Sequence, residues 1–556
     1  MNNSKKKYFR ILTLSLLFTA GLFLGVNIKG GDDDIYEKIN RNMDLFGQVY
    51  KEVALNYVDE IDADKFITAG IEGMLSTLDP YTTYIDERSR DQIDLITSGK
   101  YGGIGITVGI RDSLFYISEI MNGYEAQKKG LRVGDKIIEI DGRDLRNEKV
   151  DNMRNLVRGP VGTEVKMKID REGEIIDFAL VRQEIILKNV SYYGFLEPRN
   201  KGIGYIKLDR FTNISESEVE NAIKGLMANG EMKGLVLDLR NNGGGLLDAA
   251  IGILNKLVPK GSLLVITKGK RADSEKKIFS REEPIIPSDI PIAVLINGNT
   301  ASASEIVAGA IQDLDRGVIV GTKSFGKGLV QQIKDLDKKT QIKITGSRYY
   351  TPSGRWIQEK NYFKENKSGV FVDNDKYDQV EFKTLGGRIV KAYGGITPDI
   401  EMNVDPESEI HNALLSKDMY FKFANEYLQK NSASIAVVPA DELFSTFRVF
   451  IRESDFGYES QIEKKLIEIE QLASEKKYKL DISNMIEKVE LEAQEGEEKE
   501  IDLAKAEILK SIVDEINKRI INEAQQYEAV FPYDMQLQEA VKVLENRSEY
   551  DRLLGR

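Results

Sequence analysis

The spacing of apolar residues changes several times along this chain, and each change marks a different kind of predicted element. Near the N-terminus, apolar side chains recur at helical spacing, for example at Ile39, Met43 and Phe46. A second stretch of this kind covers about residues 63–78. We therefore expect residues 31–98 to form a helical segment.

Residues 99–186 have a different pattern, in which short apolar stretches alternate with glycines. Strands are predicted at residues 114–120 and after Gly134, with glycine turns between the strands. This part is expected to form a β-rich module.

Residues 187–404 alternate continuous apolar stretches with helical ones. Strands are predicted at residues 204–208, 234–239 and 291–297, and a helix at residues 216–227. Because strands that are apolar on both sides are covered on both faces, this alternation predicts a buried, largely parallel sheet of an α/β core.

Residues 405–556 return to helix-face spacing, with lysine and glutamate between the apolar positions. These positions are Ile462, Leu466, Ile469, Ile482, Ile486, Val489, Ile508, Ile512, Ile516 and Ile520. The pattern predicts a C-terminal helical region. Four roles are possible for this region: a packed helical cap, the interface of a homo-oligomer, a vault that holds substrate, or an arm that binds a partner.

Composition restricts the chemistry. The 556 residues exceed what one hydrophobic core holds, so two to four domains are expected. The net charge of -12 argues against a nucleic-acid partner, because binding phosphates requires clustered lysine and arginine. With no cysteine and only one histidine, His411, the chain has no thiol nucleophile and no means to build a thiolate or histidine-rich metal site. We expect no metal and no cofactor, and we place His411 in an ordinary amphipathic helix.

The first 30 residues have the pattern of a targeting segment. Lys5, Lys6, Lys7 and Arg10 precede an apolar run over residues 11–26, as in a secretory signal or a signal anchor. We favour a retained membrane anchor, a single transmembrane helix, over a cleaved signal peptide, because no clear small-residue cleavage site follows the run. Under either interpretation the rest of the protein lies outside the cytoplasm, in the periplasm or at the cell exterior.

A glycine loop opens the β-rich module. Successive backbone N–H groups in such a loop can bind the carboxylate at the end of a polypeptide, while the edge of a strand pairs with the peptide. The loop residues are Gly102, Gly103, Ile104 and Gly105. Alone, they are explained equally well by a turn between strands. Together with residues 130–135 they resemble a PDZ domain, which implies that protein substrates bind here by their C-terminal tails.

Two stretches of the α/β part carry a candidate nucleophile and a candidate base, and each has an ordinary explanation when taken alone. Ser302 and Glu305 fit a capping box at the start of a helix. Lys327 ends a glycine loop that nearly matches a phosphate-binding loop, but Gly328 occupies the place of the hydroxyl that would hold Mg²⁺. A strand, not the required helix, is predicted after it.

Together, the two stretches resemble the signature of the carboxyl-terminal processing, or tail-specific, proteases. The matching residues, in the order and spacing of that family, are Ala301, Ser302, Ala303, Ser304, Glu305, Phe325, Gly326, Lys327, Gly328 and Gln331. The resemblance covers about residues 35–401. It implies that Ser302 is the nucleophile, Lys327 the general base and Gln331 the group that orients the lysine. A neutral lysine can take the proton that an attacking serine must lose, and a glutamine carbonyl can accept from the lysine without adding negative charge.

The resemblance also implies that backbone N–H groups stabilise an oxyanion. One candidate is Ala303, at the start of the serine helix, where the helix dipole favours negative charge. The other candidate is Gly244 or Gly245, in the turn that follows a strand. Gly243 stands where the family usually has proline, which predicts a more flexible turn.

The expected fold class is therefore multidomain α+β. It comprises a signal or anchor (1–30), N-terminal helices (31–98), a PDZ β-rich module (99–186), an α/β serine-protease core (187–404) and a C-terminal helical region (405–556). The predicted function is a serine endopeptidase that recognises apolar C-terminal tails of protein substrates through the PDZ domain and cleaves them outside the cytoplasm.

Two rival hypotheses accompany this prediction. An inactive PDZ adaptor could retain the same scaffold, but the presence of Ser302, Lys327 and Gln331 favours the enzyme. Ser304 is the rival nucleophile. It lies two residues further into the same helix, so its side chain is expected to point away from that of Ser302.

Overall fold

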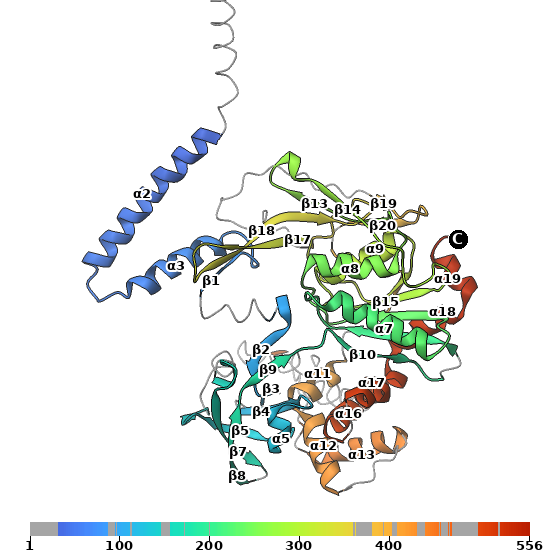
Figure 1. Ribbon diagram of the computed structural model, residues 1–556. Coiled ribbons are helices and arrows are strands. Elements are labelled where there is room, and N and C mark those ends of the chain that lie inside the picture. Colours follow the sequence, from blue (N-terminus) through green and yellow to red (C-terminus); the bar gives the residue numbers. More distant parts are fainter. Residues whose placement is uncertain are drawn as a thin grey trace, which may run out of the picture. The chain divides into compact units, whose positions relative to one another are not determined.

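The computed structural model of the chain describes most residues from Asp32 onward (Figure 1). It does not describe residues 1–31, 87–94, 96, 112–113, 146–155, 172, 199–200, 360–361, 363–380, 393, 403–407, 431–439, 455, 457–464, 466–467, 470–498 and 521–522. The expected signal or anchor lies outside the described residues, as do Ile462, Leu466, Ile482, Ile486 and Val489. The described residues form two compact units, one within residues 32–84 and one from residue 85 onward.

The first unit contains the helices α2 (Asp32–Asn56) and α3 (Ala63–Ser76), as expected from their spacing. The expected helical segment of residues 31–98 is not helical throughout, because Thr83–Ile85 forms a short strand, β1. Asp62 caps α3 by accepting a hydrogen bond from the Lys65 N–H at 3.1 Å. The rings of Tyr50 and Phe66 stack with their centroids 5.7 Å apart. Several apolar side chains of α2, among them Ile39 and Met43, are exposed. The predicted homo-oligomer is not tested by this observation and stays a prediction.

The β-rich module forms an antiparallel sheet in the order β3-β4-β5-β7-β8. These strands are β3 (Ile106–Arg111), β4 (Leu114–Ile120), β5 (Lys136–Ile140), β7 (Glu164–Arg171) and β8 (Glu174–Val181), with β6 (Arg143–Asp144) paired to β5. A separate ladder joins β2 (Lys100–Gly103) to β9 (Gln183–Ile186), and α5 (Glu125–Lys129) is a short helix. Buried residues such as Ile117, Ile137 and Val165 give the module its own hydrophobic core, which confirms the expected module.

The α/β core is built on a sheet in the order β10-β11-β12-β15-β16-β21. Its strands are β10 (Val190–Phe195), β11 (Ile203–Leu208), β12 (Gly234–Asp238), β15 (Ile292–Ile296), β16 (Val318–Gly321) and β21 (Ile400–Glu401). Only β10 is antiparallel to its neighbour, and every other pair is parallel. All residues of β12 and β15 are buried, so the prediction of a buried, largely parallel sheet is confirmed.

The two faces of this sheet are covered by helices from different parts of the chain. Alternate residues of a strand point to opposite faces. Leu235 and Leu237 of β12 pack in the cluster that contains α7 (Ser215–Asn229), α8 (Leu247–Leu257) and α9 (Ala303–Asp313). Val236, between them, packs in the cluster formed with α18 (Met535–Glu545) and α19 (Arg547–Leu553). The helices α18 and α19, red in Figure 1, therefore pack on the second face of the core sheet.

A second, antiparallel sheet carries the strand that contains Gln331. It includes β14 (Lys276–Phe279), β13 (Leu263–Gly269), β18 (Gln341–Tyr350) and β17 (Leu329–Asp335), paired in that order. A short hairpin is formed by β19 (Glu381–Lys383) and β20 (Ile389–Lys391).

Four of the described C-terminal helices pack around one aromatic and aliphatic cluster that includes Phe423, Phe447 and Ile512. They are α11 (Glu409–Ser416), α12 (Met419–Lys430), α13 (Ala440–Glu453) and α16 (Lys505–Ile520). The next elements, α17 (Glu523–Val530) and η3 (Phe531–Tyr533), place Tyr527 and Phe531 against the cluster on the second face of the core sheet. His411 is buried there, with its Nδ1 atom 2.8 Å from the Tyr420 hydroxyl, in keeping with a structural histidine. Within the described part of the chain, no helix has both the length and the apolar character that crossing a membrane requires.

Candidate active site

Ser302 lies at a sharp connection between the core sheet and a buried helix. The chain leaves β15 at Ile296 and enters α9 at Ala303. At the junction, Ser302 has φ 58° and ψ −114°, a strained conformation for a residue that is not glycine. Its N–H donates to Glu305 Oε2 at 2.8 Å, and its carbonyl accepts from the Tyr349 hydroxyl at 3.2 Å. The strained backbone is therefore fixed from both sides.

Ser304 is occupied by a structural hydrogen bond. It is completely buried, and its hydroxyl donates to the carbonyl of Asn242 at 2.9 Å. Ser302, in contrast, is partly exposed. Of the two hydroxyls, that of Ser302 is the one that a substrate can reach.

Glu305 joins the Ser302 segment to the Lys327 segment. Its Oε2 atom accepts from the Ser302 N–H at 2.8 Å and from the Lys327 N–H at 2.9 Å. Its Oε1 atom accepts from the Gly326 N–H and from the Ser324 hydroxyl, both at 2.6 Å. One fully buried carboxylate thus holds the backbone of both candidate catalytic residues.

Burial raises the pKa of the Glu305 carboxyl, whereas the four groups that donate to it act in the opposite direction. The sequence placed Glu305 in a capping box and in the family signature, without indicating a role in joining the two segments. Its bonds to residues 324–327 were missed, because no local pattern indicates that the helix start and the lysine loop meet.

The lysine loop leads directly into a strand. Lys327 is partly exposed, and β17 begins two residues later at Leu329. Gly328 lies against Trp356, whose indole Nε1 donates to the Gly328 carbonyl at 3.0 Å. A phosphate-binding loop would need a helix at this point, so the structure does not support that alternative.

Gln331 lies on β17, four residues after Lys327, as the sequence places it. It is partly buried, and its side-chain Nε2 lies 3.3 Å from the Thr345 hydroxyl on β18. Because the amide nitrogen donates to Thr345, the amide oxygen remains to accept a hydrogen bond. An acceptor is what the predicted role of Gln331, orienting a lysine, requires.

The glycine turn that follows β12 lies directly against the start of α9. Gly244 has φ 94°, and a Cβ atom there would lie 2.8 Å from Ala303 N and 2.9 Å from Ser302 Cβ. Only glycine allows this approach. At Gly245, with φ 150°, a Cβ atom would lie 2.1 Å from the Phe211 carbonyl oxygen. The structure therefore places Gly244 directly against Ser302 and Ala303, and the oxyanion role of these residues stays a prediction.

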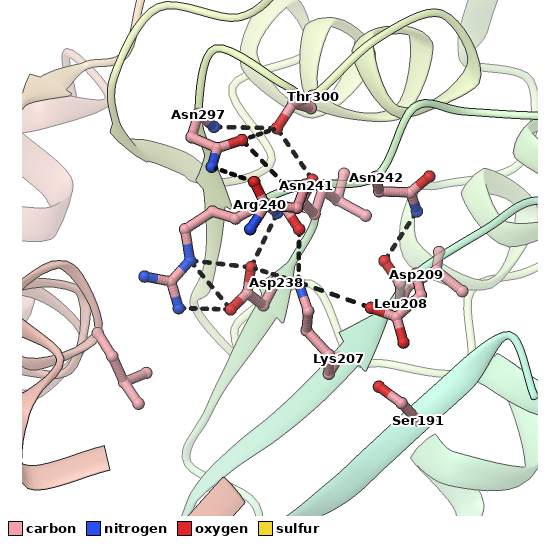
Figure 2. Close-up of polar contacts among 12 residues, drawn as sticks. Ser191, Lys207, Leu208, Asp209, Asp238, Arg240, Asn241, Asn242, Asn297 and Thr300 are labelled. Carbon is pink, nitrogen blue, oxygen red and sulfur yellow. Dashed lines mark hydrogen bonds and ion pairs between the residues drawn. The ribbon is translucent and has the colours of Figure 1, made fainter. Parts of the chain in front are cut away.

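Asn242 fixes the shape of this turn, as Figure 2 shows in part. Its side-chain amide donates to the Leu208 carbonyl at 2.7 Å, and its Oδ1 accepts from the Gly244 N–H at 2.9 Å. Its carbonyl accepts from the Ala301 N–H at 3.0 Å. Asn242 therefore connects the end of β11, the glycine turn and the residues just before Ser302.

The far end of α9 is fixed by a buried ion pair. Asp313, the last residue of the helix, lies 2.8 Å from Arg355 Nη2, and both side chains are almost completely inaccessible. Asp313 also accepts from the Ser353 N–H at 3.0 Å. With Glu305 at one end and Asp313 at the other, α9 is held rigidly behind Ser302.

The candidate carboxylate loop of the β-rich module also depends on close backbone approach. Gly102 and Gly103 lie in β2, followed by the buried Ile104. A Cβ atom at Gly105, which has φ 83°, would lie 2.4 Å from Tyr124 Cβ. The Ile104 carbonyl accepts from the Ala126 N–H of α5 at 3.0 Å. The loop therefore lies beside the helix that would form the other wall of a peptide groove.

Among the residues that the structure describes, no three or more histidine, aspartate or glutamate side chains are grouped so that they could hold a metal ion. Ser302, the backbone of Lys327 and the glycine turn at Gly244 lie close together in this site, and they offer a hydroxyl, a lysine side chain and backbone N–H groups. Such an arrangement is suited to acyl transfer through a covalent intermediate.

Four family models match successive parts of the chain. Residues 27–89 match the activating protease CtpB N-terminal domain, and residues 92–170 match a PDZ domain. Residues 202–368 match peptidase family S41. Residues 410–544 match the C-terminal helical domain of probable PDZ-proteases.

Individual proteins resemble the chain over most of their length. The carboxy-terminal-processing protease of Bartonella bacilliformis is 37% identical over 358 residues, 62% of this chain and 80% of that protein. The carboxy-terminal processing protease CtpA of Bacillus subtilis is 31% identical over 393 residues, 68% of this chain and 81% of that protein. The solved structure of a photosystem II D1 C-terminal processing protease is 26% identical, covers 65% of this chain and 93% of its own, and has a TM-score of 0.36.

Proposed function

This chain belongs to peptidase family S41 and is a carboxy-terminal processing serine protease with a PDZ domain, and we propose that Ser302 and Lys327 perform its chemistry. In this proposal Ser302 is the nucleophile, Lys327 is the general base, and Gln331 orients the lysine. The N–H of Ala303 and one N–H of Gly244 or Gly245 bind the oxyanion. The Gly244 N–H donates to Asn242 Oδ1 at 2.9 Å in this structure, so it would have to leave that acceptor to take this role.

One observation carries this assignment. The same oxygen of Glu305 accepts from the N–H of Ser302 and from the N–H of Lys327, so the two residues are neighbours in space although a strand and a helix separate them in sequence. The hydrogen bond from the Ser304 hydroxyl to the Asn242 carbonyl supports Ser302 over Ser304 as the nucleophile.

The proposed reaction follows the usual course of acyl transfer. The neutral Lys327 amine takes the proton of Ser302 as Oγ attacks the carbonyl carbon of the scissile amide. Backbone N–H groups stabilise the resulting oxyanion. The lysine then gives its proton to the leaving nitrogen, the C–N bond breaks, and an ester remains on Ser302. A water molecule, deprotonated by the lysine, hydrolyses the ester and restores the serine hydroxyl.

Substrate tails are proposed to bind at Gly102, Gly103, Ile104 and Gly105, where backbone N–H groups would take the terminal carboxylate. We expect a peptide substrate with an apolar tail to show a KM at least about tenfold higher after its C-terminus is amidated, with little change in kcat. The reason is that the amide removes the negative charge bound far from the reacting bond. Steady-state cleavage of the two peptides measures this effect.

The control for this prediction is a short peptide without the apolar tail, for which amidation is expected to change nothing. Equal KM values for the free and amidated tail peptides would contradict tail recognition through the glycine loop. They would leave the assignment of Ser302 and Lys327 untouched.

We also infer that the protease is anchored in a membrane and works outside the cytoplasm. The support is the cationic segment followed by the apolar run over residues 11–26. Added protease is expected to digest the chain in intact spheroplasts, without lysis. Protection until the membrane is broken would contradict this location.

A further inference from the structure

A residue near the C-terminal end of the chain binds the start of the glycine turn. Arg240 lies directly before the turn of residues 241–245. Its Nη1 and Nη2 atoms donate to the two carboxylate oxygens of Asp534 at 2.8 and 2.7 Å, although 294 positions separate the two residues. The paired geometry fixes the orientation of the guanidinium group as well as its position.

Gln536 of α18 also accepts from Arg240 Nη1, at 3.1 Å. The remaining contacts of Arg240 come from the core sheet, and Figure 2 shows how they converge. Its Nε atom lies 3.1 Å from both carboxylate oxygens of Asp238. Its N–H donates to Asp238 Oδ1 at 2.9 Å, and its carbonyl accepts from Lys207 Nζ at 2.6 Å. Both the side chain and the backbone of Arg240 are therefore held, and Asp534 is the charged partner supplied by the C-terminal helices.

This cluster is largely shielded from water. The exposed fractions of the side chains are 15% for Arg240, 11% for Asp534, 2% for Asp238 and 13% for Lys207. Burial opposes the charge of Arg240, but Asp238 and Asp534 raise its pKa above the ordinary value. Without Asp534, the two cations would share Asp238 and the more exposed Asp209, which lies 3.9 Å from Lys207. A shielded guanidinium that loses one of its two carboxylates is strongly destabilised.

Only a few residues of the turn separate Arg240 from Ser302, so the fixed position of Arg240 also fixes the residues next to Ser302. Two positions after Arg240, the Asn242 carbonyl accepts from the Ala301 N–H and from the Ser304 hydroxyl. Two positions further, Gly244 lies against Ser302. A shift of Arg240 would therefore move the backbone N–H groups that are proposed to bind the oxyanion.

We propose that Asp534 is a positioning residue of the active site, which clamps Arg240 and so holds the glycine turn against Ser302. The inference rests on the proposed function, because it assigns the oxyanion to this turn. Asp534 also caps α18, because it accepts from the Leu537 N–H at 3.1 Å. In this proposal the start of α18 therefore supports the oxyanion side of the catalytic centre.

The test compares three variants of the full chain. Asp534→Asn keeps a good helix cap but removes the charge that binds Arg240. Asp534→Glu keeps the charge. Tyr550→Phe is the matched structural control, since the Tyr550 hydroxyl bonds Ile292 and Arg316 on the same covered face of the sheet without touching the turn. The readouts are kcat and KM on a tail-bearing peptide, thermal unfolding, and amide hydrogen exchange of residues 240–245.

We expect Asp534→Asn to lower kcat by about 10- to 100-fold with KM changed less than about threefold, because misplaced oxyanion donors act only in the transition state. Exchange in residues 240–245 is expected to become faster, and Asp534→Glu to recover much of kcat. Tyr550→Phe is expected to lower Tm while kcat below the melting temperature stays close to wild type.

Two results would overturn the proposal. The first is an Asp534→Asn variant whose kcat and hydrogen exchange equal those of the wild type. The second is a loss of kcat that is proportional to the loss of Tm in all three variants. The exchange measurement separates this proposal from the proposed function. If the wild-type chain cleaves nothing while Asp534→Asn still loosens residues 240–245, the proposed function fails and the clamp stands.

Discussion

Replacing Ser302 with alanine is expected to abolish cleavage of a tail-bearing substrate, with kcat reduced by roughly 10⁴-fold or more. Without the hydroxyl no acyl-enzyme can form, and what activity remains comes from binding and the oxyanion donors alone. Lys327→Ala is expected to have a comparable effect, since Ser302 then has no base. The double variant is expected to be little worse than either single one, because the two groups act as a unit. Steady-state kinetics on the purified variants measures all three effects.

Ser304→Ala is the matched control for this prediction. Its hydroxyl bonds only the Asn242 carbonyl among the hydrogen bonds described for it, so its loss is expected to cost about 1–3 kcal/mol of unfolding free energy while most of the activity is kept. An active Ser302→Ala together with an inactive Ser304→Ala would reverse the assignment of the nucleophile.

Glu305→Gln is expected to reduce kcat by roughly 100-fold although Glu305 touches no substrate. Four donors converge on its carboxylate, from Ser302, Ser324, Gly326 and Lys327. A glutamine offers one acceptor oxygen and turns an NH₂ donor toward some of these groups. The Ser302 and Lys327 segments would separate, and small errors in the placement of a nucleophile and its base are costly. Kinetics and thermal unfolding measure the outcome.

A suitable control for the loss of negative charge is Glu442→Gln, in the exposed first turn of α13. It is expected to behave as wild type in both measurements. If Glu305→Gln retained full activity, the shared carboxylate could not be the element that brings Ser302 and Lys327 together.

The main elements of the fold could be predicted because their local signals are strong. Residues 234–239 and 291–297 are apolar without interruption, as expected of strands covered on both faces, and they form the centre of the core sheet. Which helices cover the second face could not be predicted. The apolar stripe of α18 resembles that of any amphipathic helix, and nothing in residues 535–545 indicates that their partners are Val236 and Leu295.

The residue types of the candidate site and their order could be predicted from the sequence. The residues that hold the site in place could not. Ser302, Lys327 and Gln331 followed from a resemblance to a known signature. Glu305 and Asp534 connect segments that are distant in the sequence, and such contacts leave no local pattern.

Gly243 illustrates how the structure changes an expectation from the sequence. It stands where the family usually has proline, which suggested a weak point in the turn. A Cβ atom at Gly243 would meet open space, whereas Gly244 has room only for hydrogen because of Ala301, Ser302 and Ala303. The turn is fixed by Asn242 and Arg240 on either side of Asn241, so the proline position is not what shapes it.

The most direct test of the central claim is covalent labelling of the full chain with a serine-reactive phosphonate, followed by peptide mapping by mass spectrometry. The account predicts a single adduct on Ser302, formed in the wild type and in Ser304→Ala and lost in Lys327→Ala. An adduct on Ser304, or cleavage of substrate by a chain whose Ser302 stays unlabelled, would contradict it.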